Sequence, residues 1–418
     1  MSRRAHLWSA LACCLALLPA AHGEDPPTYS DRYEKARAAR TKGDAAGYAA
    51  ALRSALELAP RGNPSRAGTL YELAQADAMK RDPAAALADL TRVFDEKEEP
   101  GLTFYAETDP VFAATRALPG YRALVGRVDE IQVTAKPVNG SVWAITGAGC
   151  TQAASVGPDG ILLVDAGYAR LVPKVRAALA QAAPGASVRF LVNTHVHEDH
   201  TAGNAGFAGA ATVIAHPKVR LELAAPHEFL DQTLPARPAA GLPAVTVDEP
   251  ATIHLNGEEI RLLPLLAHTD GDLVVIFAHA GVVDMGDDYF PNDGEPYLYP
   301  GDDPAAFLRG LSALEKELPA KGFAISGHAA PVPLDDLSKR LGITRKALEL
   351  VRSGIAAGLP KDEIVRRAAA AGLPSPDWIK LFDGKMRAKK ENPRVDGTGR
   401  EHRIEGSART IQTGLHSG

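Results

Sequence analysis

The spacing of hydrophobic and polar positions divides the chain into stretches of different character. Residues 29–128 are rich in alanine and carry apolar side chains at helical spacing, which predicts a region of packed helices. Residues 129–335 contain short β-branched runs separated by Gly, Pro and Asn, with helical segments between them, which predicts strands mixed with helices. Residues 336–390 return to helical spacing, and residues 391–418 show no apolar periodicity. We therefore expect an α+β protein with a C-terminal helical extension and a poorly ordered tail.

The N-terminal helical region contains a loose internal repeat. Asp44 and Asp82 each precede an alanine-rich run as a helix cap, residues 44–52 resemble residues 82–90, and Tyr71 lies in the helix expected between them. The repeat resembles tetratricopeptide-type helical hairpins, which stack and present a concave surface. Two interpretations remain: a surface that binds a protein partner, or a helical cap packed on the following domain.

The first residues have the pattern of an export signal. Arg3 and Arg4 precede an apolar stretch, Leu7–Leu18, that is short for a membrane span, and small residues lie just before Glu24. We expect residues 1–23 to be a cleaved signal peptide and the mature protein to be periplasmic or secreted, with no stable membrane span. The arginine pair leaves the general and the twin-arginine export routes open, and an uncleaved anchor is the alternative.

Composition and charge narrow the class of protein. The 418 residues suffice for two or three domains. The 51 acidic and 46 basic residues nearly balance, and no basic run is interleaved with aromatics, so no nucleic-acid partner is expected. Cleavage before Glu24 would leave Cys150 as the only cysteine, which excludes an internal disulfide. We expect Cys150 to be a small buried hydrophobe, with a reactive thiol as the alternative.

The strongest chemical signal is NTHVHEDHTAGN, residues 193–204. Within six positions it offers His195, His197, Asp199 and His200, directly after the apolar run SVRFLV. Such a density of imidazole and carboxylate groups is typical of a metal site. In an extended chain His195, His197 and Asp199 would point to one side, because side chains alternate along a strand. His200 breaks this alternation and would serve a second, adjacent ion.

Each of three later apolar runs is followed by a further side chain that can bind a metal. His268 follows LLPLLA, Asp287 follows VVDMG, and His328 follows FAISG. Strand ends that each deliver an imidazole or a carboxylate predict a site assembled at one edge of a sheet.

The motifs HVHEDHTAGN, AHTDGD, MGDDYF and SGHAAPV, in this order, resemble those of the metallo-β-lactamase superfamily. The resemblance covers residues 133–333. It implies a four-layer αβ/βα sandwich with a dinuclear metal site in the cleft at the sheet edges. Ala329 stands where the family usually has glycine, which leaves the ligand before it in place. The implied ligands are His195, His197 and His268 for the first ion, Asp199, His200 and His328 for the second, and Asp287 as the bridge.

Imidazoles and carboxylates suit Zn²⁺, and we expect two zinc ions per chain, with iron or manganese as alternatives for the same ligands. Two adjacent ions would share a hydroxide that forms near neutral pH and acts as the nucleophile. Asp199 would orient this hydroxide as well as bind metal, and is the predicted catalytic residue. Asp287 would supply the negative charge that holds two dications close together.

These features predict an exported hydrolase that cleaves an ester, lactone, thioester, lactam or phosphodiester bond of a small-molecule substrate. Family members that hydrolyse lactam antibiotics typically lack the bridging carboxylate, so Asp287 makes that activity a weaker expectation. The nucleic-acid-processing branch carries an inserted domain, for which residues 268–328 leave no room.

Two alternatives to a hydrolase stay open. One is an iron-dependent redox enzyme on the same fold, such as a sulfur dioxygenase or a diiron reductase. The other is a non-catalytic binding protein whose metals are structural.

Side chains near the motifs have two interpretations each. Asp270 and Asp272 would fix the tautomer of His268 or would be turn residues. Aromatic residues after the bridging carboxylate would line a substrate pocket or belong to the core: Tyr289, Phe290, Tyr297 and Tyr299. The histidines without partners at ligand spacing are expected to be structural or exposed: His216, His227 and His254. Substrate choice would depend on the loops 226–243 and 288–303.

Overall fold

The computed structural model describes residues 28–61, 65–96, 100–107, 109–229, 232–291, 304–373 and 379. The predicted signal peptide, residues 1–23, and the predicted tail, residues 391–418, lie outside these ranges. Within the described ranges, no helix is long and apolar enough to cross a membrane.

The N-terminal region is helical, as its apolar spacing predicted. Asp44 caps α2 by accepting a hydrogen bond from Gly47 N at 2.8 Å, and Asp82 accepts one from Ala85 N at 3.0 Å where α4 begins. Each of the first four helices packs against the next. The helices are α1 (Tyr29–Thr41), α2 (Ala45–Leu56), α3 (Ser65–Met79), α4 (Pro83–Glu96), α5 (Ala113–Arg116) and α6 (Pro119–Gly126). The 3₁₀ segments are η1 (Pro100–Glu107), η2 (Pro110–Phe112) and η3 (Arg127–Glu130).

The first sheet has seven strands in the order β1-β2-β3-β4-β5-β6-β9. Strands β1 to β4 pair antiparallel, whereas β4, β5, β6 and β9 pair parallel. Helix α7 (Val172–Ala182) connects β4 to the parallel strand β5, which makes a β–α–β unit just before the histidine cluster. The strands are β1 (Thr134–Asn139), β2 (Val142–Thr146), β3 (Gln152–Gly157), β4 (Gly160–Val164), β5 (Val188–Val192), β6 (Thr212–Ala215) and β9 (Val245–Thr246).

The second sheet has six strands in sequence order, β10 to β15, which pair antiparallel except for β13 with β14. They are β10 (Ala251–Leu255), β11 (Glu258–Pro264), β12 (Leu273–Phe277), β13 (Val282–Asp284), β14 (Phe323–Ser326) and β15 (Ala329–Pro333). A separate hairpin consists of β7 (His227–Phe229) and β8 (Gln232–Leu234). The remaining helices are α8 (Glu198–Thr201), α9 (Pro217–Leu223), α10 (Pro304–Glu317), α11 (Leu334–Ala356) and α12 (Lys361–Ala370). The short 3₁₀ segments are η4 (Ala169–Leu171), η5 (Asn204–Phe207), η6 (Ala239–Gly241) and η7 (Gly286–Asp288).

Alternating side chains build four layers from these elements. Along β4, Leu162 faces the second sheet and belongs to one core cluster with Val275 of β12. Leu163 faces the opposite way and belongs to another cluster with Val175 of α7. On the outer face of the second sheet the helices α10 and α11 cover a third cluster, in which Leu311 is fully buried. The order is therefore helix, sheet, sheet, helix, and the four-layer expectation is confirmed.

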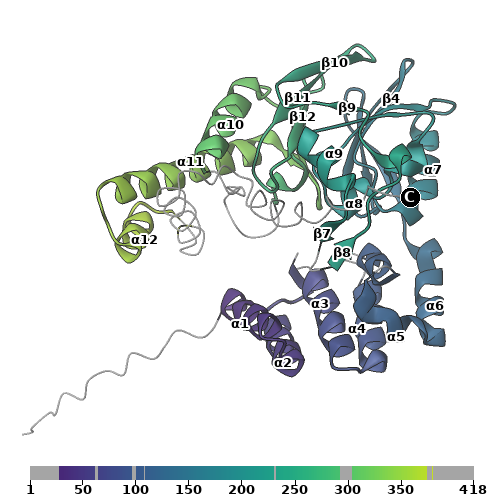
Figure 1. Ribbon diagram of the computed structural model, residues 1–418. Helices are drawn as coiled ribbons and strands as arrows, with labels where there is room; N and C mark the ends of the chain where they lie inside the picture. Colours follow the sequence, from purple (N-terminus) through teal and green to yellow (C-terminus); the bar gives the residue numbers. More distant parts are fainter. Residues whose placement is uncertain are drawn as a thin grey trace, which may run out of the picture.

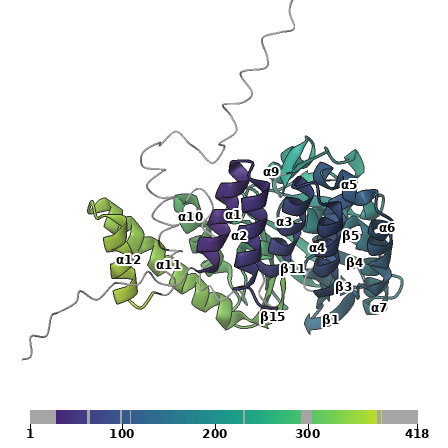
Figure 2. The same ribbon diagram turned by 90° about the horizontal axis from the view of Figure 1, so that it is seen from below.

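The N-terminal helices share a core with the first sheet. Leu70 of α3 and Phe104 of η1 lie in the same buried cluster as Leu163 of β4 and Val175 of α7. Figure 1 shows α1 to α6 on one side of the two-sheet body, and Figure 2 shows them side by side across that face. Helices α11 and α12 extend from the body at the end opposite α6 and α7.

Candidate metal centre

The histidine-rich motif begins where β5 ends and does not continue as a strand. His197 precedes the single turn of α8, and its carbonyl accepts hydrogen bonds from His200 N at 3.1 Å and Thr201 N at 3.0 Å. The expected strand-like alternation is therefore wrong beyond β5. As a result Asp199 lies with His200, and His195 lies with His197 in a different ligand group.

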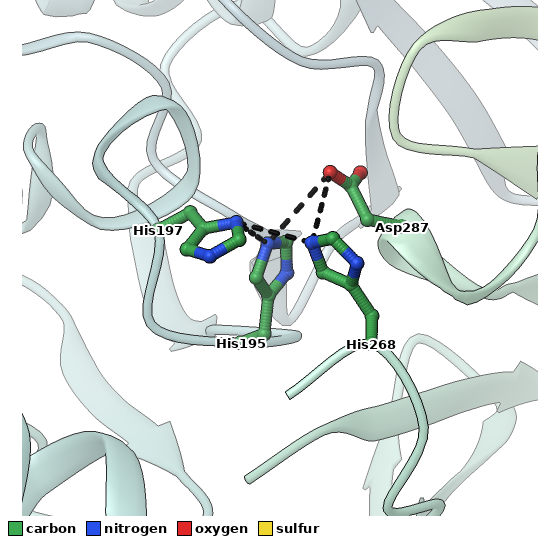
Figure 3. A group of neighbouring side chains, drawn as sticks. All are labelled: His195, His197, His268 and Asp287. Carbon is green, nitrogen blue, oxygen red and sulfur yellow. Dashed lines mark hydrogen bonds and ion pairs between the residues drawn. The ribbon is translucent and has the colours of Figure 1, made fainter. Parts of the chain in front are cut away.

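The first ligand group contains His195, His197, His268 and Asp287. The distance from His197 Nδ1 is 3.0 Å to His195 Nε2 and 3.1 Å to His268 Nε2. Asp287 Oδ2 lies 3.8 Å from His195 Nε2 and 3.7 Å from His268 Nε2. Figure 3 shows the three rings and the carboxylate directed toward one another. His268 comes from the loop between β11 and β12, and Asp287 from η7 after β13.

The second group contains Asp199, His200, His328 and again Asp287. His328 Nε2 lies 3.2 Å from both Asp199 Oδ2 and Asp287 Oδ2. His200 Nε2 lies 3.4 Å from Asp199 Oδ2 and 3.3 Å from Asp287 Oδ1. The structure thus brings all seven predicted ligands together, and Asp287 belongs to both groups.

These separations fit metal ions between the donor atoms. Nitrogen and oxygen ligands about 2.0–2.1 Å from a tetrahedral Zn²⁺ lie about 3.3 Å from one another. The distances within the two groups run from 3.0 to 3.8 Å. Among the described residues, buried His200 Nε2 and Asp287 Oδ1 have no hydrogen-bond partner. Buried polar atoms normally have one, and a cation between them would meet that need.

The protonation states of the three histidines in the first group and of Asp199 suit metal binding, whereas, against the effect of its burial, neighbouring carboxylates raise the pKa of His200. Burial, reinforced by neighbouring imidazoles, lowers the pKa of His195 well below its ordinary value and that of His197 to about 3. Burial lowers the pKa of His268 as well. Burial alone would raise the pKa of Asp199, but the His200 and His328 imidazoles hold it well below its usual range. Neutral imidazoles and an ionised carboxylate are the forms that bind metals.

Asp165, directly after β4, orients the second group, although it was absent from the predicted site. Its Oδ2 lies 2.7 Å from His200 Nδ1 and accepts the Thr194 hydroxyl at 2.8 Å. This contact turns His200 Nε2 toward the other ligands. The φ angle of Asp165 is 62°, a left-handed conformation that costs energy for a non-glycine residue and often marks functional sites. The sequence contained a usable signal for Asp165: in ILLVDAG an aspartate directly follows an apolar run, as the predicted ligands do.

Asp165→Asn is expected to weaken ion binding in the second group by roughly 10–100-fold, because an amide cannot hold the His200 ring as a carboxylate does. Competition with a chromophoric chelator measures this affinity. An unchanged affinity would contradict the orienting role of Asp165.

Asp284, at the end of β13, is a buried carboxyl outside the ligand groups. Burial, reinforced by the nearby charge of Asp165, raises the pKa of Asp284 to about 8. Between pH 4 and 8 the folded state therefore keeps a proton that the unfolded state releases, so stability falls as pH rises through this window.

Asp284→Asn removes the group whose proton uptake makes stability depend on pH. In chelator-treated protein its free energy of unfolding should rise relative to the parent by up to about 1.4 kcal/mol per pH unit. Urea unfolding across the window checks this, and a pH-independent difference would contradict it.

Neither of the two aspartates expected to accept from the His268 ring does so. Asp272 accepts hydrogen bonds from Ala267 N at 3.0 Å and Thr269 N at 2.8 Å, and Asp270 faces Lys218 at 3.6 Å. The proposed role of both aspartates in fixing the His268 tautomer is therefore not seen, and the turn interpretation holds. The adjacent Asp288 accepts a hydrogen bond from His268 N at 3.0 Å.

The other singled-out side chains divide between core and site. Tyr289 is fully buried in the cluster under α11 and belongs to the core. Phe290 stacks on the His328 ring at 5.9 Å, and so lies beside the second ligand group. Cys150 is buried, which raises the pKa of its thiol to about 12 and keeps it protonated. Tyr297 and Tyr299 lie outside the described residues.

The three histidines singled out as lacking partners at ligand spacing are structural or exposed, as expected. His216 caps α9 by accepting a hydrogen bond from Lys218 N at 3.2 Å, and His254 is exposed on β10. His227 is buried, with Nε2 3.8 Å from Glu198 Oε1. Glu198 also pairs with Arg237, so the loop after β8 is tied to α8.

One contact with the site comes from the N-terminal helical region. Tyr105 of η1 is buried, and its hydroxyl lies 3.5 Å from Asp199 Oδ1. Nothing local in the sequence indicated it, because 94 positions separate the two residues.

Comparison with curated proteins found sequence similarity over part of the chain. One curated relative is the 2,4-dinitroanisole O-demethylase subunit alpha of Nocardioides sp. (strain JS1661), 30% identical over 181 residues, which are 41% of this chain and 49% of the relative. The chain thus spans about half the length of the curated relative it matches.

Solved structures with similarity include the stereoselective inverting sec-alkylsulfatase from Pseudomonas sp. It has a TM-score of 0.43 and 17% identity over 59% of this chain and 46% of that one. A metallo-beta-lactamase from Pontibacter korlensis has a TM-score of 0.39 and 19% identity over 50% of this chain and 98% of that one. Residues 147–328 match the family model of the Metallo-beta-lactamase superfamily, and the chain has the α+β fold of that superfamily, two sheets flanked by helices.

Proposed function

We propose that the chain is a dinuclear metal-dependent hydrolase. The observation that supports this most directly is the pair of donor groups that share Asp287, with separations near those a tetrahedral ion requires. A single structural ion would need only one of these groups. Two adjoining sets at the rim of two sheets fit a catalytic centre better than a structural site.

The proposed ligand sets follow the two groups. His195, His197 and His268 would hold one divalent ion, and Asp199, His200 and His328 the other, with Asp287 between them. Zinc suits this mixture of nitrogen and oxygen donors, and iron or manganese can use the same atoms. When bound, such ions supply a water of lowered pKa and a Lewis acid that polarises the scissile bond.

The chain's own residues would position the reactants. Asp199 directs Oδ2 toward His200 and His328, where it can accept a hydrogen bond from the attacking water and orient it. Phe290 places an apolar ring against His328 and would form one wall for a substrate. Asp165 would hold the His200 ring in its orientation through the contact with Nδ1.

The proposed substrate is a small molecule with an ester, lactone, thioester, lactam or phosphodiester bond. The curated relative is named for O-demethylation of 2,4-dinitroanisole, which adds an aryl methyl ether to the bonds worth testing. Substrate choice would depend on the loops 226–243 and 288–303, which lie partly outside the described residues.

Metal analysis combined with a substrate panel tests the function. We expect about two zinc ions per chain, and hydrolysis of at least one member of a panel of lactone, thioester, lactam, phosphodiester and 2,4-dinitroanisole. A chelator should abolish the reaction and added zinc restore it. One iron per chain with oxidation of a thiol substrate would overturn the proposal in favour of a redox enzyme. No turnover by the fully loaded protein would favour a structural role for the metals.

Export and the role of the helical region are part of the same proposal. Residues 1–23 would direct the chain to the periplasm or the outside and be removed, so the mature N-terminus should be Glu24. N-terminal sequencing of secreted material checks this. The helices α1 to α4 would be tetratricopeptide-like hairpins, whose outer surface is available for a protein partner.

A further inference from the structure

Among the described residues, Tyr105 brings the N-terminal helical region into contact with the candidate metal centre. Tyr105 lies in η1, and its hydroxyl donates toward Asp199 Oδ1 at 3.5 Å. The other oxygen of that carboxylate, Oδ2, faces His328 Nε2 at 3.2 Å and His200 Nε2 at 3.4 Å. The two oxygens of Asp199 are thus divided: one faces the ligand group and the other faces the helical region.

Aromatic packing fixes the direction of the Tyr105 ring. It meets Tyr168 edge-on at 5.4 Å and Tyr71 of α3 edge-on at 6.2 Å. Tyr168 in turn packs against two glycines, and a Cβ at Gly101 or Gly149 would collide with its ring. A ring held on both sides in a dense core has little freedom to turn its hydroxyl away from Asp199.

The segment that carries Tyr105 is fastened to the β-sheet body as well. Glu107 forms a two-contact ion pair with Arg170, which follows β4. The same Arg170 lies over the Phe104 ring at 5.6 Å. Arg116 donates to the carbonyls of Ala106 at 2.8 Å and Asp109 at 2.6 Å, which fixes the end of η1.

We propose that Tyr105 is a positioning residue that holds Asp199 with a single oxygen turned toward the second ion. The helical region is then a required part of the metal site, in addition to any partner it binds. A carboxylate without this contact could rotate and offer both oxygens or neither, which would weaken the second site. This inference rests on the proposed function, because it needs two ions to be held.

The experiment compares the full chain with Tyr105→Phe, which removes the hydroxyl and keeps the ring. Tyr121→Phe is the matched control: it removes a buried phenol of α6 in the same helical region, outside both ligand groups. Metal-free protein is titrated with Co²⁺, and the visible spectrum and a competing chelator report the two binding steps separately. Thermal unfolding without metal measures folding.

We expect Tyr105→Phe to weaken binding of the second Co²⁺ by roughly 10–100-fold, with the first step and the metal-free melting temperature unchanged. Tyr121→Phe should bind both ions as the parent does. Equal second-step affinity in Tyr105→Phe and the parent would overturn the inference and leave the proposed function intact. Weakening of both steps with a lower melting temperature would overturn it too, since a general structural role would then explain the result. A parent chain that binds fewer than two Co²⁺ would overturn the proposed function itself.

Discussion

Asp287→Ala is expected to abolish hydrolysis while the protein stays folded. Asp287 Oδ2 faces His195, His268 and His328, and its Oδ1 faces His200, so one substitution removes a donor from both groups. The first group would lose its only carboxylate, and two dications would repel each other without the shared negative charge. We expect metal content to fall from two ions to at most one per chain, and kcat/KM to fall by about 10³-fold or more. Elemental analysis and steady-state kinetics measure these changes, and near-ultraviolet circular dichroism reports folding.

Asp270→Ala is the matched control for this carboxylate. Asp270 is exposed near the same sheet edge, and its partner is Lys218 at 3.6 Å. Exposed ion pairs contribute little to stability, so metal content and kinetics should match the parent. Retention of two ions and full activity by Asp287→Ala would show that the bridging assignment is wrong.

Gly327→Ala is expected to disable the site although glycine carries no ligand. A Cβ at Gly327 would lie 2.0 Å from Asp287 Oδ1 and 3.0 Å from His200 Cε1. The first contact is closer than real Cβ contacts and the second is tighter than most of them, so the carboxylate must move and the ring must give way slightly. A shift of about 1 Å in such a site costs on the order of 10²-fold in rate, and we expect at least that loss together with weaker metal binding.

Gly342→Ala tests whether this loss is specific to the site. Gly342 lies within α11, and a Cβ there meets no atom within 4 Å. Alanine is favoured over glycine inside a helix by about 1 kcal/mol, so this variant should keep its activity and melt at the same or a higher temperature. Normal kinetics in Gly327→Ala would mean that the site tolerates the added methyl group.

The sequence was sufficient to predict which seven side chains lie together at the candidate site, because each one is marked locally. His268, Asp287 and His328 each follow an apolar run, and strand ends meet at one edge of a sheet. The strand and helix patterns predicted strands mixed with helices, and the resemblance to the superfamily implied their arrangement in four layers. The prediction that side chains alternate as along a strand was wrong within the histidine motif, because the chain turns at His197 into α8. A one-turn helix leaves no periodicity to detect.

Contacts between distant parts of the chain could not be predicted in this way. The side chain of Tyr105 reaches Asp199 only because helices and sheet share one core, which no local pattern records. Asp165 carried a usable signal, but its left-handed backbone and its contact with His200 depend on the folded loop. The tetratricopeptide-like interpretation of the first helices stays a prediction.

The seven proposed ligands come from two different sheets. His195, His197, Asp199 and His200 follow β5 of the first sheet, whereas His268, Asp287 and His328 come from loops of the second. Ions held between them would therefore cross-link the halves of the sandwich at its rim. Because such ions bind only the folded chain, free metal at 100 times its Kd would add about 2.7 kcal/mol to stability. The thermal tolerance of the protein would then follow the zinc supply of its surroundings, and metal starvation would expose it to proteolysis.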